Sequence, residues 1–315
     1  MKRIFAWQTD TAGCFMYRIY WPLSRLDKSK FEVAWGAPGP DIHDYDIVIG
    51  QRIAGDNGLW RELCRNPNIF TVYDLDDDLL NVDPENSVPY SIYHPVRDHT
   101  QINIDMADAV TVSTSNLADM FGLSVGIHVL PNCLPQSYFD PHDPIVWPPV
   151  LGWGGSMFHR QDWPGIKEQL RIVMANIPGL SFHTVGADYI DGAFPHRSTP
   201  WSTVDNYLRS LDFTLGIAPL VPTKFNQSKS HVKLLEYASR GIPAVATNWG
   251  QYSEYIQDGY NGWLIKEPLQ WSVTLLDLLT DPDGLKQLSG NAYQYALNFT
   301  TERNIHLWES VYARA

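Results

Sequence analysis

The stretch from Phe225 to Ile265 reads FNQSKSHVKLLEYASRGIPAVATNWGQYSEYIQDGYNGWLI and lies in a pattern of alternating strands and helices. Gly241 and Pro243 end a predicted helix, because glycine favours a helix terminus and proline cannot continue one. Residues 242–247 are apolar and predict a buried strand. Asn248–Gly250 then forms a tight turn into a second helix over 252–257. The stretch therefore predicts one repeating α/β unit of a parallel sheet.

The helix that ends at Gly241 carries charges suited to a nucleotide. Lys229 and Lys233 lie four residues apart around its expected start, and Ser228 or Ser230 can cap it. Two ammonium groups and a positive helix end would together suit a diphosphate. Glu236 follows one turn beyond Lys233, where its carboxylate can reach a ribose diol. We interpret this helix as part of a donor-nucleotide site, with both lysines catalytic.

This pattern resembles the donor-site signature of retaining glycosyltransferases of the GT-B type, in the large family-4-like group (glycosyl transferases group 1). A compact branch of that group combines an Asp-rich strand end, a Gly-Gly-Ser loop and a Lys-x3-Lys-x2-Glu motif, and the resemblance runs from about Arg18 to Trp271. The group's Glu-x7-Glu pattern has its first glutamate at the position of Ser228. The residues that match its second half are Glu236, Ala238, Gly241, Pro243 and Val245.

The resemblance implies an α/β protein of GT-B architecture, with two Rossmann-like, doubly wound parallel-sheet domains facing across a cleft. Strand patterns at 3–7, 31–35, 46–50, 69–74, 109–113 and 127–130 alternate with helical ones and support a first such domain. A proline-rich passage over 135–149 reads as a linker. We therefore predict an acceptor-side domain at 1–145, a donor domain at 146–295, and a C-terminal helix at 296–315 that packs back on the first domain.

Composition limits the function classes. The 315 residues carry a formal net charge of −12, which argues against broad attraction to nucleic acid or anionic lipid. No apolar run reaches the roughly 18 residues of a membrane span, and the N-terminus lacks the apolar core of a signal peptide. Cys14, Cys64 and Cys133 show no paired spacing, which favours reduced thiols. We expect a cytoplasmic protein without a transmembrane segment.

A glycine-rich loop follows the first strand of the second half, at Gly154, Gly155 and Ser156. Glycines let the backbone approach a phosphate, and the serine can donate to it; a plain tight turn is the alternative. The resembled family often places an Arg and a Lys here, where this chain has Trp153 and Phe158. We expect His159, in a catalytic role, and Arg160, in donor binding, to substitute for them.

Further donor residues follow from the resemblance. Two loops flank the nucleobase in that fold, and one of them holds Arg197. Phe225 and Asn226 would close the site under the donor sugar, and Ser228 and Ser230 complete the predicted donor-binding set.

Ligands of doubly wound sheets bind beyond the carboxyl ends of the strands. In the first half an acidic run, Asp74 to Asp78, occupies such a position. It can bind acceptor hydroxyls or cap the next segment, and Asp74 with Asp76 would serve as ligands only if a metal is present. We otherwise predict no metal site. The residues that we assign to the acceptor side are Gly13, Arg18, Arg52, Asp76, Asp77 and His94.

The predicted function is transfer of a sugar from a nucleoside diphosphate sugar, most readily a UDP- or GDP-sugar, to an acceptor hydroxyl. Retention of configuration is implied by the resemblance. No cofactor is required, and Mg²⁺ is not expected. The acceptor is a surface glycan or similar molecule. The alternatives are a DNA-base glycosyltransferase of phage type, which would make nucleic acid the acceptor, a non-catalytic nucleotide-sugar-binding protein, or an epimerase of the same architecture.

Overall fold

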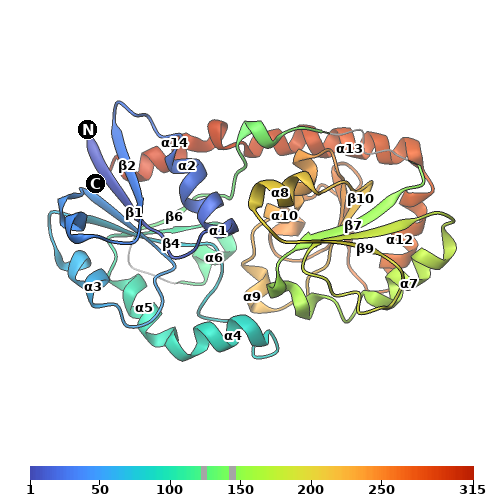
Figure 1. Ribbon diagram of the computed structural model, residues 1–315, viewed down its shortest axis with the longest axis horizontal. Helices are drawn as coiled ribbons and strands as arrows, with labels where there is room; N and C mark the ends of the chain where they lie inside the picture. The colour runs from blue at the N-terminus through green and yellow to red at the C-terminus, as the bar shows by residue number, and fades with distance from the viewer. Residues whose placement is uncertain (122–125, 142–146) are drawn as a thin grey trace. The chain divides into compact units, whose positions relative to one another are not determined.

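The computed structural model describes residues 1–121, 126–141 and 147–315, and the chain divides into two compact α/β units (Figure 1). Unit 1 comprises 1–133, 227–230 and 299–315, and unit 2 comprises 134–226 and 231–298. The predicted boundary after residue 145, and part of the predicted proline-rich linker, lie outside the described residues. The helix α14, Thr301–Tyr312, belongs to unit 1.

Unit 1 is built on a six-stranded sheet in the order β2-β1-β3-β4-β5-β6, with every neighbouring pair parallel. Because β2 and β3 lie on opposite sides of β1, the strand order reverses between β1 and β3, which is the switch point where such sheets bind ligands. The strands are β1 (Lys2–Trp7), β2 (Phe31–Gly36), β3 (Ile47–Gln51), β4 (Phe70–Leu75), β5 (Ala109–Val112) and β6 (Gly126–Val129).

Each face of this sheet has its own apolar core. On one face, Trp60 of α3, Ile104 of α5 and Leu117 of α6 pack against the sheet. On the other, Ile19 and Trp308, from the first helical segment and from α14, do so. The helical segments are α1 (Gly13–Phe15), a π-helix (Met16–Tyr20), α2 (Trp21–Leu23), α3 (Gly58–Arg65), α4 (Ser87–Tyr93), α5 (Arg97–Asp105) and α6 (Ser115–Asp119), with 3₁₀ turns at Pro40–Asp44 and His94–Val96.

Unit 2 contains a second six-stranded sheet in the order β12-β11-β10-β7-β8-β9, again parallel. Its switch point lies between β7 and β10, because β8 and β11 follow on opposite sides. The strands are β7 (Val150–Gly155), β8 (Ser181–Gly186), β9 (Arg197–Pro200), β10 (Leu215–Ala218), β11 (Ala244–Thr247) and β12 (Gly262–Ile265).

Helices cover both faces of this sheet as well. Leu170 of α7 and Leu275 of α12 pack on one face. Tyr207 of α8 and Tyr237 of α10 approach the other, next to Gly154 and Gly216. The helices are α7 (Lys167–Asn176), α8 (Val204–Arg209), α9 (Lys224–Gln227), α10 (Val232–Ser239), α11 (Gln251–Tyr255), α12 (Gln270–Leu279) and α13 (Pro282–Ala296), with 3₁₀ turns at Gln136–Tyr138, Met157–Asp162 and Leu297–Phe299.

Each unit is built on a parallel, doubly wound α/β sheet, as predicted.

Within the described residues, no helix is both long enough and apolar enough to cross a membrane.

Candidate functional site

The switch point of unit 2 is lined by glycine. Strand β7 ends in Gly154 and Gly155, which the sequence had placed in a loop. A Cβ atom on Gly154 would lie 2.7 Å from the Tyr207 hydroxyl, and one on Gly155 would lie 2.6 Å from the Lys233 ammonium. Since real Cβ atoms do not approach other atoms so closely, only glycine lets these groups lie against the strand end.

Lys233 supplies the positive charge at this strand end. It is 4% exposed, its Nζ donates to the Gly154 carbonyl, and it lies 4.8 Å from the centre of the Trp153 ring. A desolvated ammonium over an indole face is held by a favourable cation–π interaction. Trp153 is itself fully buried and packs edge-on against Trp163 at 5.2 Å. The Trp153 indole therefore supports a lysine from α10 at the end of β7.

Glu236 lies on the same helix, one turn after Lys233. Its Oε2 accepts a hydrogen bond from the Tyr207 hydroxyl at 3.0 Å, and the side chain is buried. The next residue, Tyr237, accepts from the Gly154 backbone N–H at 2.7 Å. Burial raises the pKa of Tyr237, so its hydroxyl keeps its proton and can also donate to the Ile217 carbonyl. Helix α10 is thus fixed to β7 and β10 by hydrogen bonds.

The prediction that Ser228 or Ser230 caps the start of this helix is wrong. Helix α10 begins at Val232, its N-cap is His231, and no side chain caps it. Residues 227–230 are grouped with unit 1 instead, where Ser230 accepts from Asn132 at 2.9 Å. The Ser228 carbonyl accepts from Thr114, which is the N-cap of α6. Both residues therefore make contacts within unit 1, Ser230 through its hydroxyl and Ser228 through its backbone carbonyl.

Lys229 lies in the same segment and is also outside the helix. Its ammonium is 3.7 Å from an Asp77 carboxylate oxygen of unit 1. Lys233 belongs to unit 2, so the two lysines that the sequence analysis joined in one site have different immediate partners.

The other residues near β7 that were predicted to bind the donor nucleotide sugar lie at the start of, or within, the 3₁₀ turn that follows this strand. Ser156 is the N-cap of this turn, and its hydroxyl accepts from the Phe158 N–H at 3.4 Å. His159 Nδ1 is 2.8 Å from Asp162 Oδ2, and Arg160 is exposed. Asp162 is a residue that the sequence analysis missed; its signal was its position three residues after His159.

Phe225 and Asn226 lie on the short helix α9 after β10. Both are buried, and the Asn226 amide donates to Asp162 Oδ1 at 2.8 Å. Asn226 is therefore placed beside the β7 turn, at the switch point.

Arg197 lies at the amino-terminal end of the strands, opposite the end that carries the candidate site. It pairs in register with His183, near the amino end of β8, and its guanidinium binds Asp212, which precedes β10. Burial acts to raise the pKa of Asp212, but hydrogen bonds from His183 and Arg197 prevail and lower it to about 2. Because ligands of such sheets bind at the carboxyl edge, we leave Arg197 out of the proposed donor site.

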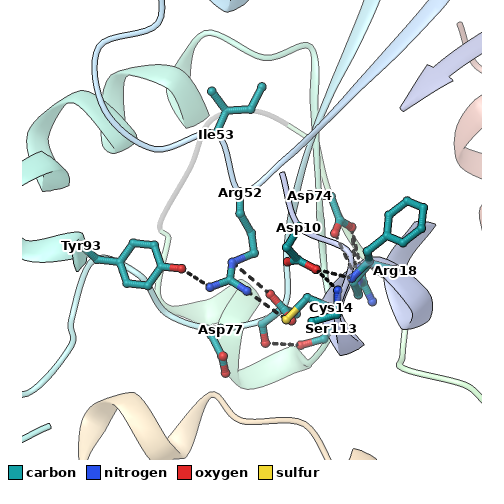
Figure 2. A network of polar contacts seen from close by, with 12 residues as sticks. Asp10, Cys14, Arg18, Arg52, Ile53, Asp74, Asp77, Tyr93 and Ser113 are labelled. Atoms are coloured by element: carbon teal, nitrogen blue, oxygen red, sulfur yellow. Dashed lines mark hydrogen bonds and ion pairs between the residues drawn. The ribbon is translucent and has the colours of Figure 1, made fainter. Parts of the chain in front are cut away.

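The switch point of unit 1 is a network of paired charges (Figure 2). Arg52 follows β3 with a φ of +51°, a left-handed conformation that is strained for a residue other than glycine. Its guanidinium donates to the Tyr93 hydroxyl and to Cys14 Sγ at 2.9 Å, and its Nε lies 3.7 Å from Asp76. Burial lowers the pKa of Arg52, but the negative charges around it raise it well above its ordinary value.

Arg18 makes the second pair of this network, in the buried interior. Its Nη2 donates to Asp74 Oδ2 at 2.8 Å, and Nη1 donates to the Leu130 carbonyl and to Asn132. Thr111 also donates to Asp74, at 2.7 Å. Arg18 is 1% exposed. We therefore treat Arg18 as a positioning residue, because its guanidinium nitrogens already have partners.

The remaining residues that were predicted for the side of the sugar acceptor also belong to unit 1. Gly13 begins α1, and Asp77 faces Lys229. His94 is exposed and stacks on Tyr90, with 4.4 Å between the ring centres. Among the residues that the structure describes, no three His, Cys, Asp or Glu side chains gather closely enough to hold a metal ion.

The two parallel sheets, with a lysine at the glycine-lined switch point of one of them, define a two-unit α/β protein with a site suited to a phosphate ester. Residues 167–281, which are less than half of the chain, match the family model of glycosyl transferases group 1. The D-inositol 3-phosphate glycosyltransferase of Thermobispora bispora is 30% identical over 118 residues, which cover 37% of this chain and 26% of that protein. The chain thus spans about a quarter of this relative's length.

Solved structures resemble the whole chain. Sucrose-phosphate synthase from Thermosynechococcus elongatus matches with a TM-score of 0.72 at 14% identity over 100% of both chains. HepE of Anabaena, in complex with UDP-glucose, matches with a TM-score of 0.68 at 15% identity over 99% of this chain and 100% of that chain. Identities this low show the fold alone, which is the GT-B fold of glycosyltransferases.

Proposed function

We propose that this protein is a glycosyltransferase that moves a sugar from a nucleoside diphosphate sugar to an acceptor hydroxyl with retention of configuration. The observation that carries the proposal is the position of Lys233, whose ammonium is held by Gly154 and Trp153 at the switch point of unit 2. The family match over 167–281 and the GT-B fold support the class of reaction.

In this proposal Lys233, with the glycine-lined end of β7, stabilises the negative charge that develops on the departing diphosphate. Glu236 binds the ribose diol, and the Tyr207 hydroxyl orients its carboxylate. The diphosphate takes the proton of the incoming hydroxyl on the face that it leaves, so no carboxylate nucleophile is needed. The residues supply positioning and electrostatic stabilisation, without a metal ion or other cofactor.

HepE was solved with UDP-glucose, and on this fold likeness we propose UDP-sugars as the first donors to test, with GDP-sugars next. We place the acceptor, a glycan or similar hydroxyl compound, with unit 1, whose switch point carries Arg52 and Asp76. A net charge of −12 favours such an acceptor over DNA. Free thiols at Cys14, Cys64 and Cys133 are consistent with a cytoplasmic location.

The test is a thermal-shift titration with UDP-, GDP-, dTDP-, ADP- and CMP-sugars, with and without Mg²⁺, on the wild type and on Glu236→Ala. We expect one nucleotide to raise the melting temperature of the wild type, and the rise to be lost in Glu236→Ala. Glu254→Ala is the matched control, because Glu254 is an exposed carboxylate of unit 2. If no nucleotide sugar stabilises the wild type, the assignment of the donor site is wrong.

Transfer itself is tested separately. Incubation with the stabilising donor and a panel of glycans should release the nucleoside diphosphate, and the anomeric configuration of the product is read by NMR. Donor binding without transfer to any hydroxyl compound would favour the non-catalytic binding protein instead.

A further inference from the structure

Asp162 joins three segments at the switch point of unit 2. It ends the 3₁₀ turn that follows β7, and its side chain is fully buried. One carboxylate oxygen, Oδ2, contacts His159 Nδ1 at 2.8 Å. The other, Oδ1, accepts from the Val221 backbone N–H at 2.9 Å and from Asn226 Nδ2 at 2.8 Å. The carboxylate therefore connects the β7 turn to the loop and helix that follow β10.

These contacts determine which way the Asn226 amide is turned. Its Nδ2 lies within hydrogen-bonding distance of Asp162 Oδ1 and of the Val221 carbonyl, at 2.8 and 3.0 Å. Both neighbours are acceptors, so the NH₂ group must face them, and the reversed amide would set three oxygens against one another. The carbonyl oxygen Oδ1 consequently points away from Asp162.

That carbonyl oxygen is left without a partner. Asn226 is fully buried, and its Oδ1 makes no hydrogen bond with any described residue. Buried amide oxygens are nearly always hydrogen-bonded, so an unpartnered one needs an explanation. A bound ligand with a hydroxyl donor would provide the missing partner.

The same carboxylate orients His159. A carboxylate accepts hydrogen bonds, so His159 Nδ1 carries the hydrogen in this contact. The ring lies edge-on to Trp153, with 6.1 Å between the ring centres, and Trp153 supports Lys233 on its face. Asp162 thus fixes two polar side chains close to the end of β7, which the Lys233 ammonium contacts.

Asn226 Oδ1 is thus a buried acceptor beside the turn that follows β7, at the end of the sheet where ligands bind. We propose that Asp162 is a positioning residue that presents Asn226 Oδ1 to a hydroxyl of the donor sugar. Asn226 then determines sugar specificity, and Asp162 keeps its amide in the accepting orientation. This inference rests on the proposed function, since it assumes that a nucleotide sugar occupies the site.

The first experiment separates the sugar from the nucleotide. Dissociation constants are measured by calorimetry for UDP, for UDP-glucose and for its 2-, 3-, 4- and 6-deoxy analogues, and for GDP and GDP-glucose, on the wild type and on Asn226→Ala. We expect the wild type to bind one deoxy analogue about tenfold more weakly than UDP-glucose, which is the order of one hydrogen bond. Asn226→Ala should bind UDP-glucose about tenfold more weakly and no longer discriminate against that analogue.

The affinity for UDP alone should be the same in the wild type and in Asn226→Ala. Equal discrimination among the analogues in both proteins would overturn the role of Asn226 while leaving the proposed function intact. Failure of the wild type to bind UDP, GDP and both sugars, together with no stabilisation by any nucleotide sugar of the thermal-shift panel, would overturn the proposed function and this inference with it.

The second experiment tests Asp162 by a signature that loss of packing alone would not produce. Nitrogen chemical shifts of the histidine rings report which ring nitrogen carries the hydrogen. In the wild type His159 should carry it on Nδ1, and Asp162→Asn should lose this preference. Asp212→Asn is the matched control, because Asp212 Oδ1 holds His183 Nδ1 at 2.7 Å at the other edge of the sheet.

Asp212→Asn should change only the His183 signals and leave the analogue discrimination as in the wild type. Asp162→Asn should weaken UDP-glucose binding as Asn226→Ala does, and Asp162→Glu should restore part of it. An unchanged His159 tautomer together with unchanged discrimination in a folded Asp162→Asn protein would overturn the positioning role.

Discussion

The two parallel sheets differ in strand order, and their switch points have opposite composition. In unit 1 the strand ends meet at buried ion pairs, Arg18 with Asp74 and the strained Arg52 with Asp76. In unit 2 the strand end is glycine, and the Lys233 ammonium contacts a carbonyl and an indole face there. A buried guanidinium–carboxylate pair stabilises one geometry, whereas an ammonium at a glycine-lined strand end is suited to an anionic ligand. We therefore expect substitution of the buried Arg18–Asp74 pair to act on stability, and substitutions at the β7 strand end to act on catalysis.

The largest effect is expected at the buried pair of unit 1. Arg18→Met would leave the Asp74 carboxylate without its counterion, which costs about 3–5 kcal/mol of unfolding free energy for a buried pair. Urea denaturation of the wild type and of the variant measures this loss of unfolding free energy. The double variant Arg18→Met with Asp74→Leu should recover most of the loss, because no charge is then left unpaired. A loss below about 1 kcal/mol in the single variant would show that this pair is not the structural clamp of unit 1.

The next largest effect is expected at the ammonium of unit 2. Lys233→Ala should lower kcat by roughly 100-fold, as removal of a transition-state donor does, with only a small change in melting temperature. Lys286→Ala, an exposed lysine of α13, is the control. Lys229→Ala should cost less than Lys233→Ala, since Lys229 is paired with Asp77. Equal losses in both lysine variants would contradict the contrast between the two switch points.

A smaller effect should follow from filling the glycine-lined strand end. In Gly155→Ala the new Cβ would come 2.6 Å from Lys233 Nζ, so the ammonium has to move. A displacement of this size should reduce kcat about tenfold, in line with the sensitivity of catalysis to positioning. Gly165→Ala is the control, because a Cβ there has no atom within 4 Å. Steady-state kinetics of the two variants distinguish crowding at the site from a general effect of alanine.

The smallest effect concerns pH. Burial lowers the pKa of His231, the N-cap of α10, to about 4. The folded state therefore binds this proton less readily than the unfolded chain, whose histidine pKa is about 6.5. The contribution of His231 to the free energy of unfolding is fully present above pH 6.5 and is lost as the pH falls toward 4. The free energy of unfolding should therefore fall by about 1 kcal/mol between pH 7.5 and 5.5. The melting temperature of His231→Gln should fall less over this interval than that of the wild type, whereas the exposed His306→Gln should behave as the wild type does.

The sheets could be predicted because their strands are buried on both faces. Runs such as 47–51 and 109–112 are rich in apolar and β-branched residues, and their predicted limits differ from the observed ones by at most one residue at each end. Strand β9, Arg197–Pro200, was missed because it is polar and ends in proline, as edge strands can be. The first helical segment, residues 13–23, is divided by a π-helical segment at Met16–Tyr20, for which the sequence has no simple signal.

The site was less predictable than the sheets. Lys233 and Glu236 were found because both lie on one helix with regular spacing. The partners of Arg18 and Asn226 lie 56 and 64 residues away in the chain, and no local spacing indicates such contacts. Ser228 and Ser230 misled the prediction of the α10 cap, because a cap motif does not reveal that a four-residue segment packs in another unit.

The division of the chain into two units also determines which fragments could fold alone and which segments could be exchanged between relatives. Unit 1 takes its residues from three separate stretches, and its core includes Trp308 and Tyr312 from the C-terminal helix. A fragment ending at residue 133 would lack those side chains and the four residues 227–230. An exchange of N-terminal halves between relatives would therefore succeed only if α14 and the segment before α10 were inherited with the first half. These two pieces should change together over evolution, although more than sixty residues separate them in the sequence.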